Sequence, residues 1–105
     1  MEQVYEAIEV AKKTGKIKKG VNEVTKAIER GEAKLVAVAK DITPPEIAMH
    51  LPLLAKDKGI PYFQVGSREE LGTAAGLGVK ASAVAIVKEG DAKNIIEGLA
   101  KQKSE

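Results

Sequence analysis

The chain has 105 residues, of which 44% are apolar and 30% are charged, and its formal net charge is +2. A chain of this length and composition folds as one domain with a modest core rather than staying disordered. It contains no cysteine, which excludes disulfides, thiolate-bound zinc and thiol catalysis. No N-terminal segment resembles a signal peptide, and no apolar run approaches the ~18 residues of a membrane helix. We therefore expect a cytoplasmic protein without a membrane partner.

Apolar residues recur at helical spacing in some segments and form short uninterrupted runs in others. The short runs are typical of strands buried on both faces of a sheet, whereas the lysines around Ile17 are typical of an edge strand. In chain order, the expected elements are a helix at 2–14, an edge strand at 17–19, a helix at 21–30, a strand at 35–39, a helix at 44–58, a strand at 62–65, a helix at 68–75, a loop at 77–80, a strand at 81–87, a helix at 92–100 and a polar tail at 101–105.

The boundaries of these elements carry their own signals. Capping boxes are predicted at Thr43–Glu46 and Ser67–Glu70, and Asp91 is predicted to cap the last helix. Pro52 should kink or split the helix that contains it. Strands separated by helices should be largely parallel and covered on both faces. The predicted fold is therefore α/β, a three-layer α/β/α sandwich around a small mixed sheet of about four strands, in one domain spanning 1–105.

The helix expected at 21–30 has two chemically different faces. One arc of the helical wheel holds Val21, Val24, Ala27 and Ile28, and the other holds Asn22, Glu23, Lys26 and Arg30. The second arc combines an amide, a carboxylate, an ammonium and a guanidinium, whereas a solvated face usually carries only Glu and Lys. Asn22 and Glu23 also fall in the first turn, where unpaired backbone N–H groups point outward. An asparagine near the start of a helix is, however, more often only a cap.

Positive charge is concentrated before and within this helix. Residues 12–26 contain six lysines and the single acid Glu23, a local net charge of +5. On a nearly neutral chain, such a patch indicates either a phosphate-binding surface or an ordinary lysine-rich surface. Further along, Leu77 and Val79 flank Gly78 in a predicted loop, where apolar side chains are costly unless covered. Either they fold back onto the core or they cover a bound group such as an unstacked RNA base.

The sequence shows no catalytic or metal-binding pattern. Gly72, Gly76 and Gly78 follow a helix and precede a strand, whereas a phosphate-binding loop follows a strand and precedes a helix. His50, the only histidine, has no evident partner for a metal or for a Ser–His pair, and we expect it to be structural. We therefore expect no enzyme activity, no metal and no cofactor.

Motifs spread over nearly the whole chain carry a family resemblance. They are Gly20-Val21-Asn22-Glu23-Val24-Thr25-Lys26, Glu29-Arg30-Gly31, Ala39-Lys40-Asp41, Pro44-Pro45-Glu46-Ile47, His50-Leu51-Pro52-Leu53-Leu54, Ile60-Pro61-Tyr62, Leu71-Gly72 and Ala75-Gly76. In order and spacing they resemble the kink-turn RNA-binding ribosomal proteins. The resemblance is closest to the archaeal large-subunit "L-seven-Ae" family.

The resemblance implies binding to the kink-turn, a sharply bent RNA with tandem sheared G·A pairs. The implied partners are ribosomal RNA, box C/D and H/ACA guide RNA, ribonuclease P RNA and ribonucleoprotein core proteins, and we expect a monomer. By this match, Gly20 belongs to the RNA-binding motif, and Asn22, Glu23 and Lys26 contact the guanines of the G·A pairs. The phosphates are faced by Lys16, Lys18, Lys19 and Arg30, and the loop Leu77-Gly78-Val79 covers a flipped-out nucleotide.

The chemistry of a sheared pair agrees with this transfer. Guanine N1–H and O6 stay largely free, so a carboxylate suits the donor and an ammonium suits the acceptor. Glu23 would otherwise repel phosphate from a basic patch. Thr43 and Gly78 stand where family members often carry an acidic residue. A second hypothesis is a protein-interaction module of the same fold, which docks on ribonucleoprotein partners and binds RNA weakly.

Overall fold

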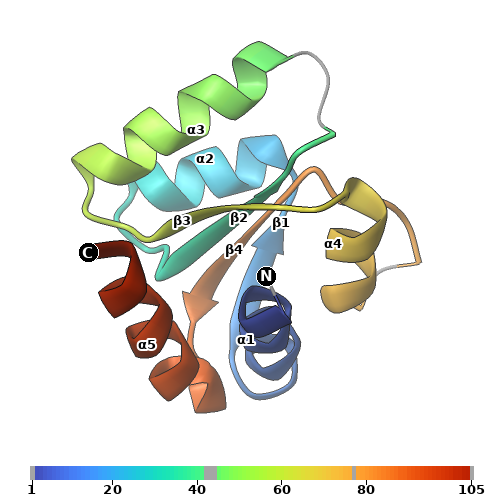
Figure 1. Cartoon of the computed structure of the whole chain (residues 1–105), viewed down its shortest axis with the longest axis vertical. Helices are drawn as coiled ribbons and strands as arrows, with labels where there is room; N and C mark the ends of the chain where they lie inside the picture. The colour runs from blue at the N-terminus through green and yellow to red at the C-terminus, as the bar shows by residue number, and fades with distance from the viewer. Residues whose placement is uncertain (1, 42–44, 77, 105) are drawn as a thin grey trace.

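The chain folds into a four-stranded sheet between two layers of helices (Figure 1). The computed structural model describes residues 2–41, 45–76 and 78–104, with the backbone alone for 45–49 and 102–104. Its elements are α1 (Glu2–Thr14), β1 (Lys16–Lys19), α2 (Val21–Glu29), β2 (Leu35–Ala39), α3 (Pro45–Asp57), β3 (Tyr62–Val65), α4 (Arg68–Ala74), β4 (Ala83–Lys88), a 3₁₀ turn (Gly90–Ala92) and α5 (Lys93–Ser104). The predicted α/β sandwich with a mixed four-stranded sheet is confirmed.

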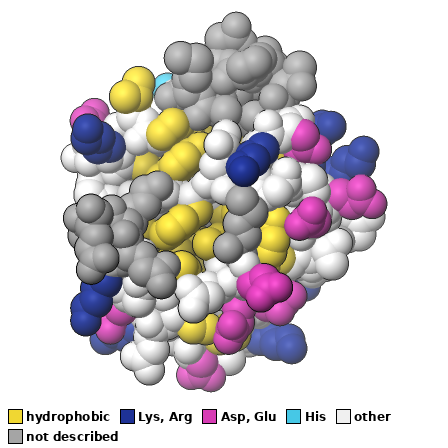
Figure 2. Space-filling view, in the orientation of Figure 1, with side chains coloured by type: hydrophobic (Ala, Val, Ile, Leu, Met, Phe, Trp, Pro, Cys, Tyr) yellow, Lys and Arg dark blue, Asp and Glu magenta, His cyan; other side chains and the backbone are white. Residues whose placement is uncertain are grey.

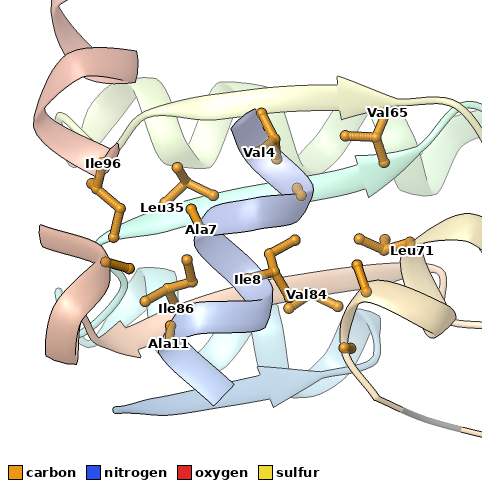
Figure 3. Packing of buried hydrophobic residues seen from close by; sticks show 14 of the residues in the cluster. Val4, Ala7, Ile8, Ala11, Leu35, Val65, Leu71, Val84, Ile86 and Ile96 are labelled. Atoms are coloured by element: carbon orange, nitrogen blue, oxygen red, sulfur yellow. The ribbon is translucent and has the colours of Figure 1, made fainter. Parts of the chain in front are cut away.

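One core cluster lies between the sheet and the layer formed by α1, α4 and α5 (Figure 3). Val4, Ile8 and Ala11 line the inner face of α1, at the helical spacing that the sequence predicted. They pack in one cluster with Leu35 of β2 and Ile86 of β4. This packing anchors α1 against the middle of the sheet.

A second cluster holds α2 and α3 on the opposite face of the sheet. Val24 and Ile28 of α2 are fully buried, and they share the cluster with Leu51 of α3 and with Val36 and Val38 of β2. The predicted core face of α2 is thus confirmed. Because this face is held against the sheet, the polar face of α2 is turned outward.

The sheet is less parallel than the alternation of helices and strands predicted. Only β2 and β3 run parallel, and β4 runs antiparallel to both β1 and β2. A parallel crossover must carry the chain back along a whole strand. The seven residues of α4 rise only about 10 Å as a helix. The chain therefore enters β4 at the end of the sheet where β3 finishes, and the strand runs the opposite way (Figure 1).

Several predicted boundaries also differ from the structure. β4 begins at Ala83 rather than Ala81, because the Ala81 N–H donates to the Arg68 carbonyl (3.0 Å) instead of to a neighbouring strand. Residues 101–104, expected to form a polar tail, continue α5. Asp91 does not cap that helix, because it lies inside the 3₁₀ turn that precedes it.

Of the features predicted at α3 and α4, the cap at Ser67 is confirmed, whereas those at Pro52 and His50 differ. Pro52 lies inside α3, which runs through it without being split; a proline removes one backbone hydrogen bond, and the neighbouring turns keep theirs. His50 is exposed on the same helix, so it is not the satisfied structural residue that was expected. The Ser67 cap is confirmed, since its Oγ accepts from the Glu70 N–H (3.1 Å). The capping box predicted at Thr43–Glu46 lies outside the residues whose side chains are described.

Candidate functional site

The polar helix α2 starts directly after the edge strand β1, at a glycine. Gly20 occupies the N-cap with φ 90° and ψ 148°, a conformation that is essentially restricted to glycine. Its N–H donates to the Ala83 carbonyl of β4 (2.9 Å), and its own carbonyl accepts from the Val24 N–H (2.9 Å). Gly20 therefore joins the sheet edge to the helix and places the first turn of α2 beside β1.

The mixed face of α2 is exposed, as the sequence predicted. Asn22, Glu23, Lys26 and Arg30 all lie at the surface. Asn22 is not the cap, since Gly20 holds that position, and its side chain makes no hydrogen bond with the described part of the chain. Glu23 Oε1 lies 3.9 Å from Lys26 Nζ, and both side chains are more than half exposed. Such a pair contributes little stability, so both groups are available to a bound partner.

A hollow of about 290 Å³, here called the α2 hollow, lies between α2 and the β1–β4 pair. The structure brings together here five of the eleven residues predicted to bind RNA, plus a lysine that was not predicted. Lys88 of β4 stands opposite Lys16 in the antiparallel register, beside an irregularity in the pairing. The side chains that line the hollow are Lys16, Lys18, Glu23, Lys26, Ala27, Arg30, Glu32, Val87 and Lys88. Five of these are cations and two are carboxylates, so the hollow favours an anionic partner.

A second hollow of about 370 Å³, here called the α1 hollow, lies on the other side of β1. It is lined by Lys12, Ile17, Lys18, Lys19, Glu23 and Ala75. Lys18 and Glu23 line both hollows, so these two side chains form the ridge that separates them. Lys12 comes from α1 and Ala75 from the end of α4, and only the tertiary fold brings them beside β1. Asn22 lines neither hollow.

The loop after α4 borders the α1 hollow. Val79 exposes 71% of its surface, so the alternative that it folds back onto the core is wrong. Gly78 is exposed as well, and Leu77 lies outside the described residues. At the start of this loop, Lys12 Nζ donates to the Gly76 carbonyl (3.1 Å). Both flanks of the loop thus touch the basic edge, Gly76 through Lys12 and Ala83 through the Gly20 N–H.

The face of the molecule formed by α1 and α4 has a different character. Figure 2 shows this face, where Asp and Glu side chains gather over α1 and α4. Glu9, Glu69 and Glu70 line a hollow there with Tyr5, whose hydroxyl donates to Glu70 Oε2 (3.2 Å). Burial raises the pKa of Tyr5 above its ordinary value of 10.0.

The described ranges hold neither a metal-binding cluster nor a membrane-spanning helix. Among those residues, no group of three or more His, Cys, Asp or Glu side chains is placed to hold a metal ion. No helix within them has the length and apolar character needed to cross a membrane. The basic edge along β1 is the candidate functional site because its hollows gather cationic side chains from β1, α2, β4 and α1.

The fold and this surface define a small α/β/α domain with a basic, mixed-charge helix face beside an exposed apolar loop. The model of the Ribosomal protein L7Ae/L30e/S12e/Gadd45 family matches residues 2–96, and the chain belongs to this family. Among solved structures, it is similar to the Giardia lamblia 15.5kD RNA binding protein, with 34% sequence identity and a TM-score of 0.89. That match covers 96% of this chain and 84% of the other. The resemblance noted in the sequence is thus confirmed for the family.

Proposed function

We propose that this protein recognises and stabilises kink-turn RNA, without catalysis, as a component of the ribosomal large subunit and of guide ribonucleoproteins. The family and the similarity to a protein named as RNA-binding support binding to RNA. The observation that carries the kink-turn proposal is the position of Glu23. It is an exposed carboxylate on the ridge between two basic hollows, next to Asn22 and Lys26 on α2.

A carboxylate at this place distinguishes base recognition from simple attraction to phosphate. The lysines and the arginine of the α2 hollow would bind any RNA backbone, and Glu23 would only weaken that binding. Glu23 becomes favourable if it accepts the N1–H of a guanine in a sheared G·A pair. Lys26, 3.9 Å away, would then donate to guanine O6, and Asn22 would contact the adjacent base.

The remaining site residues extend this contact in two directions. Lys16, Lys18, Lys19 and Arg30 would face phosphates from the two hollows, with Gly20 shaping the turn between β1 and α2. On the other side, the loop Leu77-Gly78-Val79 would cover a flipped-out nucleotide. The exposed Val79 offers an apolar surface for such a base.

The proposed partners are ribosomal RNA, box C/D and H/ACA guide RNA and ribonuclease P RNA, together with ribonucleoprotein core proteins. We propose that the chain acts as a single RNA-binding domain spanning 1–105, as a monomer in the cytoplasm. Within its family it would belong to the archaeal large-subunit branch that the motifs resemble.

A gel-shift comparison of two RNAs tests the proposal. One is a kink-turn, and the other has the same length with Watson–Crick pairs in place of the sheared G·A pairs, so both carry the same phosphate charge. Binding to the second should be at least tenfold weaker, because each lost base-edge contact is worth about 1–3 kcal/mol. Equal binding to both RNAs would favour the second hypothesis, a protein-interaction module of the same fold.

A further inference from the structure

We propose that Lys12 is a positioning residue for the RNA site, because it holds the end of α4 from which the Val79 loop departs. The inference rests on the proposed function, in which this loop covers a flipped-out nucleotide. Lys12 lies on α1, outside the motifs that resemble known RNA-binding proteins. Its role is visible only in the packing of α1 against α4.

The contact itself joins α1 to the carbonyl end of α4. Lys12 Nζ donates to the Gly76 carbonyl (3.1 Å). The last turn of α4 has no basic residue of its own, although the carbonyl end of a helix carries partial negative charge and favours a cation. Lys12 supplies that cation from a neighbouring helix.

The glycine at this position allows both the turn and the contact. Gly76 has φ +71°, a left-handed conformation that favours glycine at a helix C-terminus. A Cβ added there would lie 1.7 Å from Lys12 Nζ. A side chain at Gly76 would therefore strain the backbone and also displace the ammonium group.

The far end of the loop is tied to α4 as well. The Ala81 N–H donates to the Arg68 carbonyl (3.0 Å), and a Cβ added at Gly72 would lie 2.2 Å from the Val79 carbonyl oxygen. The Val79 backbone thus packs closely on α4 while its side chain stays exposed. Because α4 supports the loop, a residue that fixes the end of α4 also fixes where Val79 is presented.

Lys12 also lines the α1 hollow, where its charge could act directly on an RNA phosphate. The two roles differ in what they predict. A phosphate contact contributes to the salt dependence of binding and is independent of the flipped base. A positioning role acts through Val79, so its effect should disappear when the RNA has no base for Val79 to cover.

Three variants separate these roles. Lys12→Met removes the amine, Lys13→Met removes an equal charge from the next, exposed position of α1, and Lys12→Arg restores a cationic donor. Affinities are measured for a kink-turn and for the same RNA with an abasic site at the flipped position. We expect Lys12→Met to bind the intact kink-turn about threefold to tenfold more weakly than Lys13→Met, the loss expected for one hydrogen bond.

On the abasic RNA, the two methionine variants should bind equally. The two methionine variants should also show the same dependence of affinity on salt. On the intact kink-turn, Lys12→Arg should bind like the unsubstituted protein. Equal losses on both RNAs, with a salt slope shallower by one contact for Lys12→Met, would overturn the proposal and make Lys12 a phosphate ligand. So would an unchanged affinity of Lys12→Met for the intact RNA.

A measurement without RNA separates this inference from the proposed function. In the free protein, the amide NMR signals of Gly78 and Val79 should shift in Lys12→Met and stay in place in Lys13→Met. Unshifted signals in Lys12→Met would overturn the positioning role even if kink-turn binding is real. Conversely, if the unsubstituted protein fails to prefer the kink-turn over its G·A-disrupted control, the proposed function fails, whereas the NMR comparison still decides whether Lys12 positions the loop.

Discussion

Glu23 is the residue whose effect on RNA affinity has opposite signs under simple electrostatic attraction and under base recognition. It lies on the ridge between the two basic hollows. Among the described residues, its ion-pair partner is Lys26, at 3.9 Å. In a purely electrostatic surface, this carboxylate weakens RNA binding. As the acceptor of a guanine N1–H, it strengthens binding to one class of RNA. The sign of its contribution therefore distinguishes the two kinds of surface.

The substitution Glu23→Gln tests that sign. Kink-turn binding should weaken by about 1–3 kcal/mol, the size of a lost base-edge contact, because a neutral hydrogen bond replaces a charge-assisted one. Binding to unstructured RNA should stay equal or tighten slightly. Parallel titrations of both RNAs at one salt concentration measure the two changes. Glu29→Gln, which removes the same charge from the same helix outside the hollows, is the matched control and should weaken neither. Tighter kink-turn binding by Glu23→Gln would refute the guanine contact.

A second prediction at the scale of one residue concerns Gly20 and the free energy of unfolding. A Cβ at Gly20 would meet no atom within 4 Å, so the only cost of Gly20→Ala is its backbone conformation, about 1–3 kcal/mol. Gly98 also has free space, but it lies within the helix α5. Gly98→Ala should therefore stabilise the protein by about 0.5–1 kcal/mol. Urea unfolding of both variants measures these changes, and equal effects would show that the turn into α2 does not require a glycine.

At the scale of elements, the site joins one helix, one edge strand and one loop. The mixed face of α2 points outward because its apolar face is held in the core by Val24 and Ile28. The lysines of β1 remain accessible because β1 is an outer strand of the sheet. The loop after α4 adds an apolar side chain that makes no contribution to the core. We therefore expect binding and stability to respond separately to changes in this loop.

The variant Val79→Asp tests this separation. Kink-turn binding should weaken by about 1–3 kcal/mol, the size of a lost base stack, while the melting temperature should change little because Val79 is 71% exposed. Leu53→Asp is the matched control, since Leu53 is 68% exposed on α3, away from both hollows. It should leave kink-turn binding nearly unchanged. A large drop in melting temperature for Val79→Asp, with normal binding by the folded fraction, would instead assign Val79 a structural role.

Across the whole molecule, charge is divided between the β1 edge of the sheet and the face formed by α1 and α4. Both basic hollows lie along β1, and the acidic hollow lies between α1 and α4, on the face seen in Figure 2. The formal net charge of only +2 conceals this division. An RNA backbone would therefore be oriented toward one edge of the protein, although the chain as a whole is nearly neutral.

The salt dependence of binding should report this concentration of charge. Four phosphate contacts, by Lys16, Lys18, Lys19 and Arg30, predict a slope of about −3 in a plot of log K against log[salt], and a fifth contact by Lys88 would make the slope about −4. Lys88→Gln should make the slope shallower by about one contact, because Lys88 lines the α2 hollow. Lys58→Gln, which alters an exposed lysine following α3, should not. A slope near zero for the unsubstituted protein would contradict the phosphate contacts.

Much of the fold and part of the site followed from local pattern. The core faces of α1 and α2 depend on the period of the helix, and β2 is recognisable because a strand buried on both faces must be apolar throughout. The mixed face of α2 was predictable for the same reason, since the side of a packed helix opposite its apolar arc faces solvent. The motifs around Asn22 also identified the family before any packing was known.

Only the tertiary structure decided which distant residues share the site. Lys88 joins the α2 hollow because β4 pairs with β1, a register that neither strand specifies alone. Lys12 reaches Gly76 because α1 packs on α4, and the Val79 backbone packs against Gly72 while its side chain stays exposed. The antiparallel direction of β4 likewise depends on where the chain emerges from the short helix α4. Periodicity shows which side of an element faces the core. Pairing and packing between elements depend instead on contacts between residues far apart in the chain, and a local pattern contains no information about those contacts.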